Sequence, residues 1–165
     1  MESKPKLDLR ELKVDQFGYV YKDIEQQARI WETQFNMPKF NFLPPHVGQV
    51  NYRGKETEIT IKMGFSRNFN VQIELIQSIE GKSIYKEFLD QGREGLQHIS
   101  CSVENIEAQI DRFKKLGYEP VQSGIAFGNR MYAYFGTENI LGVMLEIQGP
   151  IKGRRKKAEN EKKRI

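Results

Sequence analysis

The sequence predicts an α+β fold in which two βαβββ modules form one cupped, mixed-sheet domain around a cleft. Two observations indicate it. Residues 14–20 and 96–102 align at an offset of 82, and in both places a strand-like run leads through a short turn into a helix. Two further strand-like runs follow the first helix and three follow the second. Because one such unit cannot bury both its helix and its sheet face alone, we expect the two units to pack into one body.

The first module, about residues 14–78, opens with a strand at 14–20 and a helix capped by Asp23. Asn36 and Pro38 are expected to end this helix. Apolar residues at helical spacing predict one buried face, made of Ile24, Ala28, Trp31 and Phe35. The later strand-like runs cover 58–65 and 71–77, and residues 43–54 between helix and strands are expected to form a loop.

The second module, about residues 95–149, follows a helical connector at 83–91 that Ser83 caps and Gly92 closes. Its helix starts after Asn105 and ends at Gly117. The apolar face of that helix repeats the spacing of the first, with Ile106, Ile110, Phe113 and Leu116. Strand-like runs at 118–122, 131–135 and 143–148 complete the module. The expected organisation is an extension at 1–13, the domain at 14–150 and a tail at 151–165.

Composition is that of an ordinary globular protein, with 38% hydrophobic and 29% charged residues among 165. No apolar run approaches the roughly 20 residues that a membrane span requires, and the N-terminus does not resemble a secretory signal. One cysteine, Cys101, excludes an internal disulfide and a thiolate zinc cluster. These features favour a cytoplasmic protein.

The net charge of +4 comes from the tail. Residues 151–165 hold eight basic side chains against Glu159 and Glu161, whereas the first 150 residues carry a small excess of acidic ones. Such a charge run is usually a solvated, disordered end. A tether to nucleic acid or another acidic surface is the weaker alternative, so we expect no nucleic-acid partner for the domain itself.

Polar residues occur where the strands should be apolar. Glu74 and Glu146 lie in the closing strand-like runs of the two modules, and Gln16 and His98 share one repeat position in the opening strands. Either glutamate alone would most simply face solvent. A buried, unpaired carboxylate would cost several kcal/mol and would require a cation, a proton or a partner. Four polar side chains at matched places are a more specific signal and should converge on one cleft between the modules.

The chain resembles the vicinal-oxygen-chelate superfamily, which includes glyoxalase I, methylmalonyl-CoA epimerase, extradiol dioxygenases and fosfomycin-resistance proteins. The resemblance covers about residues 14–150. It is carried by four segments in order, 16–25, 73–76, 92–99 and 142–147, and the stretch 83–89 is similar to the epimerase branch. It implies the glyoxalase-like fold, a small-molecule substrate, a homodimer and no membrane partner.

The same resemblance implies one divalent metal ion held by Gln16, Glu74, His98 and Glu146. One imidazole with hard oxygen ligands suits Zn, Co, Ni, Mn or Mg. The implied activity is that of a lyase or isomerase of the glyoxalase–methylmalonyl-CoA epimerase type, in which a proton moves next to a carbonyl through a metal-stabilised enediolate. Glu146 is the first candidate for the catalytic acid–base and Glu74 the second.

Departures from the family pattern narrow this activity. A single histidine ligand argues against ring-cleaving oxygenases, which use two. Val20, Ser78 and Glu94 stand where glyoxalase I has its glutathione clamp, and residues 43–54 contain no glutamate to act as a second base. Gln16 replaces the histidine of many relatives. The alternative function is therefore a metal-free small-molecule binding protein of the bleomycin-resistance type.

Other residues receive structural interpretations. His46 is expected to be an ordinary loop histidine, and Cys101 a small buried apolar residue. Arg130 could reach the cleft, but a surface position is the simpler expectation. Tyr52 and Arg53 could hold a carboxylate or phosphate of a substrate, although residues of these types in a loop more often have no such role.

Overall fold

Strands dominate the chain in a computed structural model that describes residues 8–68 and 70–151. The first part contains η1 (Leu9–Glu11), β1 (Val14–Val20), α1 (Ile24–Gln34), β2 (Asn41–Phe42), β3 (His46–Tyr52), β4 (Lys55–Asn68) and β5 (Val71–Glu80). The second part contains α2 (Ile84–Asp90), β6 (Gly95–Ser102), α3 (Ile106–Lys115), β7 (Pro120–Ala126), η2 (Phe127–Asn129), β8 (Arg130–Phe135), α4 (Glu138–Leu141) and β9 (Met144–Pro150).

The nine strands form one mixed sheet in the order β2-β4-β3-β7-β8-β9-β6-β1-β5, and an additional pairing of β4 with β5 closes it. Strands β1 and β5 run parallel, as do β6 and β9. Strands β3 and β7 pair over Val50–Gly124, Asn51–Ser123 and Tyr52–Gln122. The mixed α+β prediction is therefore confirmed, and the sheet closes into a barrel-like body.

The three helix starts that the sequence predicts are confirmed. The side chains of Asp23, Ser83 and Asn105 each accept a hydrogen bond from a backbone N–H in the first turn of α1, α2 and α3, at 2.9, 3.2 and 3.3 Å. After α3, Gly117 has a φ of 87°, which glycine adopts without strain.

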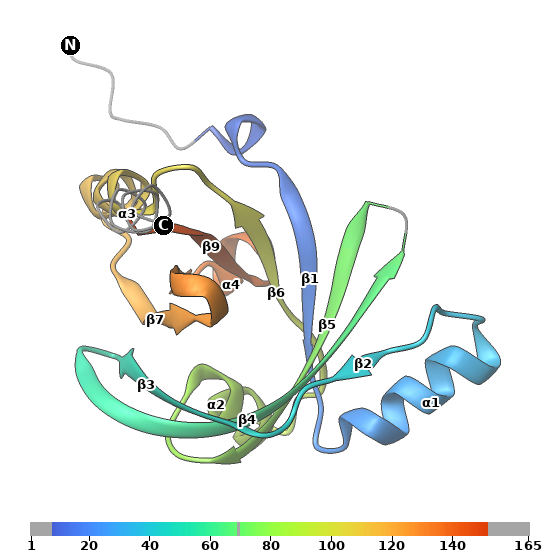
Figure 1. Cartoon of the computed structure of the whole chain (residues 1–165). Coiled ribbons are helices and arrows are strands. Elements are labelled where there is room, and N and C mark those ends of the chain that lie inside the picture. The colour runs from blue at the N-terminus through green and yellow to red at the C-terminus, as the bar shows by residue number, and fades with distance from the viewer. Residues whose placement is uncertain (1–7, 69, 152–165) are drawn as a thin grey trace, which may run out of the picture.

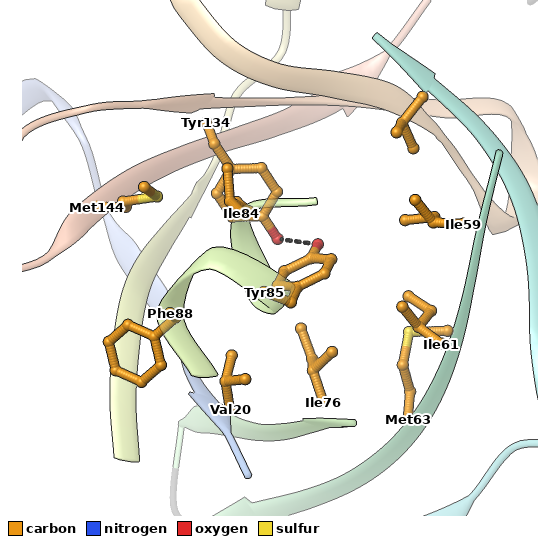
Figure 2. Close-up of a cluster of buried hydrophobic side chains, with 11 residues drawn as sticks. Val20, Ile59, Ile61, Met63, Ile76, Ile84, Tyr85, Phe88, Tyr134 and Met144 are labelled. Atoms are coloured by element: carbon orange, nitrogen blue, oxygen red, sulfur yellow. Dashed lines mark hydrogen bonds between the residues drawn. The ribbon is translucent and has the colours of Figure 1, made fainter. Parts of the chain in front are cut away.

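The helices bury their apolar faces against different parts of the sheet. α1 packs on β5 and α3 on β8 and β9, at opposite sides of the molecule (Figure 1). α2 contacts β1 and β5, and its Ile84, Tyr85 and Phe88 join Ile59, Ile61 and other strand residues in one buried cluster (Figure 2). This packing puts α2 against the interior of the barrel.

The predicted buried face of α1 is only partly correct. Ile24 and Ala28 are buried, and Trp31 packs edge-on against Tyr19 at 4.9 Å between ring centroids. Phe35 is 71% exposed, because the helix ends at Gln34 and the chain turns away at Asn36, where φ is 53°. The period of a helix predicts a buried face only as far as the helix continues.

The loop expected at residues 43–54 is wrong for most of its length, because residues 46–52 form β3. Arg53 and Gly54, with φ of 50° and 80°, make the two-residue turn of a hairpin that joins β3 to β4. Positive φ at both positions is typical of the tight turns that match strand twist. Among the described residues, no helix is long and apolar enough to cross a membrane.

Candidate functional site

Three neighbouring strands bring Glu74 and His98 together. In the register of the sheet, Gly18 on β1 pairs with Glu74 on β5 and with His98 on β6. Paired residues in adjacent strands point to the same face. Glu74 and His98 therefore flank Gly18 on the inner face of the barrel.

Gly18 leaves the room that the imidazole of His98 occupies. A Cβ at position 18 would lie 1.8 Å from Cε1 and 2.0 Å from Nε2 of that ring. Sequence reasoning placed Gly18 inside a family segment and gave it no role. The available signal was a glycine in a strand interior, which often marks a close approach of another group.

The second carboxylate, that of Glu146, belongs to a neighbouring set of paired residues in the sheet. Ser100 on β6 pairs with Gln16 on β1 and with Glu146 on β9. Nε2 of His98 lies 3.4 Å from Oε2 of Glu74 and 3.7 Å from Oε2 of Glu146. The side chains of Glu74 and Glu146 are 10% and 7% exposed and that of His98 is fully buried, so a solvent-facing role for the two glutamates is wrong.

Hydrogen bonds fix the orientation of two of these side chains. Nδ1 of His98 lies 2.7 Å from Oε1 of Gln97, a distance at which the ring N–H donates to the amide oxygen. Nε2 of His98 then faces the two carboxylates. Gln16 donates from Nε2 to Oε1 of Gln72 at 2.8 Å. Among the described residues, Nε2 of His98 and Oε2 of Glu146 are two of the buried side-chain atoms that have no hydrogen-bond partner.

Burial controls the electrostatics of the site. It raises the pKa of Glu146 to about 7, while His98 acts in the lowering direction and Glu74 in the raising direction. Burial also raises the pKa of Tyr134 and Tyr85, whose hydroxyl groups are 3.0 Å apart. A carboxyl group with a pKa near neutrality is suited to accept and return a proton.

These residues meet at a cavity of about 370 Å³. That volume lies in the range of small-molecule sites. Its lining comprises Gln16, His46, Gly48, Gln49, Val50, Ile59, Ile61, Met63, Phe65, Gln72, Glu74, Tyr85, Ile125, Ala126, Arg130, Tyr132, Tyr134, Glu146 and Gln148. Gln16, Glu74 and Glu146 thus reach the cavity, whereas His98 is near both glutamates but does not line it. Within residues 8–68 and 70–151, no group of three or more His, Cys, Asp and Glu side chains has the arrangement of a ready-made metal site.

Two residues that were expected to have no role in the site line the cavity. His46 is the first residue of β3, not part of a loop, and lines the cavity. Arg130, expected at the surface, also lines it. Both were missed for the same reason: alternation along β3 and β8 decides which side chains point inward, and that alternation needs strand pairing to be fixed.

Tyr52 and Arg53 lie elsewhere and are engaged within the protein. The Tyr52 hydroxyl donates to Glu87 on α2, and the Arg53 guanidinium donates to both oxygens of Glu87 at 2.8 and 2.9 Å. The suggestion that they hold a substrate anion is therefore not supported. Cys101 is buried as expected, and burial raises its thiol pKa to about 12.

A family model described as the glyoxalase/bleomycin resistance protein/dioxygenase superfamily matches residues 15–135. This chain belongs to that superfamily. The match includes β1, β5 and β6, and ends before Glu146 on β9. A comparison with curated proteins finds no match.

Solved structures share the fold at low identity. A hypothetical protein from Bacillus halodurans has a TM-score of 0.61 and 19% identity over 85% of this chain and 95% of its own. Methylmalonyl-CoA epimerase from Mycobacterium tuberculosis has a TM-score of 0.60 and 18% identity over 84% and 87%. A variant of the Streptomyces coelicolor epimerase in complex with 2-nitronate-propionyl-CoA gives 0.61 and 12% over 86% and 96%. At these identities the likeness establishes the fold of the superfamily member described here, and no more.

Proposed function

We propose that this superfamily member is a metal-dependent lyase or isomerase that moves a proton at a carbon next to a carbonyl. The observation that carries the proposal is the pair of buried atoms without a partner, Nε2 of His98 and Oε2 of Glu146. Leaving such atoms unpaired costs about 1–3 kcal/mol each, and a bound cation removes that cost. We also propose that the two halves of the chain are repeated modules. The opening and closing strands of each half pair in parallel, β1 with β5 and β6 with β9, which supports this.

The proposed ligands of a divalent metal are Gln16, Glu74, His98 and Glu146, and the spacing of the last three supports the site. Zinc lies about 2.0–2.2 Å from nitrogen and oxygen ligands, so two ligand atoms on one tetrahedral ion are about 3.4 Å apart. The distances from Nε2 of His98 to the two carboxylates, 3.4 and 3.7 Å, are close to that value. Gln97 would hold the imidazole from its other nitrogen, as partners of metal-bound histidines commonly do.

The bound metal would supply Lewis acidity that stabilises the negative charge left on the carbonyl oxygen. The protein itself moves the proton. Glu146 is buried and faces the cavity, so its carboxylate can take the proton and return it. Glu74 is the second candidate, since it reaches the same cavity from the opposite side of Gly18.

Metal analysis tests the site. Protein purified without chelator or a metal-affinity tag should contain about one divalent ion per chain. His98→Ala and Glu146→Gln should each reduce that content at least tenfold. Glu80→Gln, an exposed change at the end of the same strand as Glu74, is the matched control and should leave it unchanged. Unchanged metal content in both site variants would show that the ion binds elsewhere.

Hydrogen exchange tests the chemistry without knowledge of the natural substrate. Candidate 2-oxo acids, hemithioacetals and 2-methyl-branched acyl thioesters are incubated with the metal-loaded protein in heavy water. Deuterium should appear at the carbon next to the carbonyl of at least one compound, and Glu146→Gln should abolish it. Exchange that survives in Glu146→Gln would exclude this residue as the base.

The second candidate function is a metal-free small-molecule binding protein. It is favoured by the mainly apolar cavity wall and by the amide of Gln16, which is engaged with Gln72. Tight binding of a compound by metal-free protein, unaffected by Glu146→Gln and Glu74→Gln and without exchange, would support this function instead.

A further inference from the structure

The inner wall of the barrel changes from apolar to cationic along two strands. On β4 the alternate residues Ile59, Ile61, Met63 and Phe65 line the cavity, and the next residue in this alternation is Arg67. On β8 the corresponding series is Tyr134, Tyr132 and Arg130. Each row of apolar or aromatic side chains therefore ends in an arginine.

The two arginines meet at a groove that continues the cavity. This groove, of about 630 Å³, shares Gln72, Arg130 and Gln148 with the cavity. Its other lining residues are Lys13, Asp15, Arg67, Asn70 and Ser102. We call Lys13, Arg67 and Arg130 with the groove between them the cationic mouth.

The three cations of the cationic mouth have no salt-bridge partner within the part of the chain that the structure describes. Among the described residues, no carboxylate lies within salt-bridge distance of any of them, whereas Arg53, Lys62 and Lys86 all have one. The polar contacts that the two arginines make are long and to neutral groups: Arg130 to Ser102 Oγ and Arg67 to the carbonyl of Asn70, both at 3.4 Å. With Asp15 as the acidic residue in the lining, the groove has an excess of positive charge.

The charge of the inner wall differs between the cationic mouth and the far end of the cavity. The register runs from Arg67 on β4 to Gln72 on β5, Gln16 on β1, Ser100 on β6 and Glu146 on β9. An anionic group is attracted at the arginine end of this row and repelled at the glutamate end. The apolar residues of the cavity can contact a hydrocarbon or aromatic part of a ligand. They provide no hydrogen bond or opposite charge for a second charged group on it.

We infer that the ligand of this cavity is an amphipathic anion. Its carboxylate or phosphate group binds Arg67, Arg130 and Lys13 in the cationic mouth, and its apolar body extends into the cavity toward Glu146. Arginine suits such a group because its planar fork can bind two oxygens at once. That the apolar part of the ligand carries the reacting carbonyl rests on the proposed function. The binding of the anion does not rest on it.

Calorimetric titration of the full-length, metal-free protein tests the inference with four probes: decanoate, decyl phosphate, decanol and acetate. Decanoate or decyl phosphate should bind at least tenfold more tightly than decanol, which lacks the charge, and than acetate, which lacks the apolar body. Arg130→Gln and Arg67→Gln should each weaken anion binding about tenfold and leave decanol binding unchanged. Arg29→Gln, an exposed arginine on α1, is the control of equal charge and should have no effect.

The stronger of the two anions identifies the head group as a carboxylate or a phosphate. Equal binding of decanol and the anions, binding of none of the probes, or wild-type affinity in both arginine variants would each overturn the inference. Because these titrations contain no metal and no reaction, a failure of metal binding or hydrogen exchange leaves their outcome unaffected. The proposed function and this inference can therefore fail separately.

Discussion

At the scale of single residues, the absence of a side chain at position 18 matters as much as the presence of His98. The imidazole lies over the backbone of β1, in the volume that a Cβ of residue 18 would fill. Neighbouring strands are about 4.8 Å apart, so a buried ring can tilt over the adjacent strand only where that strand carries glycine. Gly18 is in this sense a positioning residue for the site.

Gly18→Ala should displace the imidazole of His98, because the added methyl group would overlap Cε1 and Nε2 of the ring. We expect overpacking to destabilise the fold by about 1–3 kcal/mol and the metal content to fall with it. The measurement combines thermal unfolding with metal analysis of the purified protein. Gly136→Ala is the control, since a Cβ there would meet Glu138 and Val121 at an ordinary 3.5 Å. A Gly18→Ala protein with wild-type stability and full metal content would contradict this account of the packing.

At the scale of elements, Glu87 links α2 to the hairpin of β3 and β4. The hydrogen bonds from Arg53 lower the pKa of Glu87, with a further contribution from Tyr52. A carboxyl group whose pKa is lower in the folded chain stabilises the fold above its ordinary pKa of 4.5, and this contribution is lost as the pH falls through the lowered value. The link helps to hold α2 against the barrel interior, where Tyr85 forms part of the cavity wall.

Replacing Glu87 with glutamine should therefore lower stability near pH 7 and have a shrinking effect as the pH falls below about 4.5. The side chains of Arg53 and Glu87 are 52% and 30% exposed, so solvent screening limits the expected loss to about 1 kcal/mol. Urea unfolding of both proteins at a series of pH values measures it. Glu56→Gln, an exposed change on β4, should show no such pH dependence. A difference that stays constant down to pH 3 would rule out the charged pair as its cause.

At the scale of the whole molecule, closure of the sheet ties both halves of the chain into one body. The pairing of β4 with β5 and of β3 with β7 leaves β9 and its last residue, Pro150, inside the continuous sheet. The tail predicted at 151–165 lies, from residue 152, outside the described residues. Its disorder therefore remains a prediction from composition.

A chain ending at Pro150 should melt within a few degrees of the full-length protein. Residues 151–165 contain two aliphatic side chains larger than alanine, Ile151 and Ile165, too few to contribute much buried apolar area. Calorimetry of the two proteins at equal concentration provides the comparison. A large fall in melting temperature would indicate that the tail packs against the domain.

The sequence by itself determined the local structure of this protein. Helix caps at Asp23, Ser83 and Asn105 depend on a side chain and a backbone N–H three residues away, so they can be read from neighbouring residues. Apolar periodicity located most helices and strands for the same reason. The unusual carboxylates in β5 and β9 and the repeat position shared by Gln16 and His98 were enough to select the residues that the structure brings together.

Tertiary structure alone decided how those elements pair. Residues 46–52 mix His46, Gly48 and polar side chains and show no clear strand period, yet they form β3 because β4 and β7 supply its hydrogen bonds. The inward direction of His46 and Arg130, the overlap of His98 with the empty position at Gly18, and the closure of the sheet follow from that pairing. Strand pairing joins residues that are far apart in the chain, and no local sequence pattern identifies the partner strand.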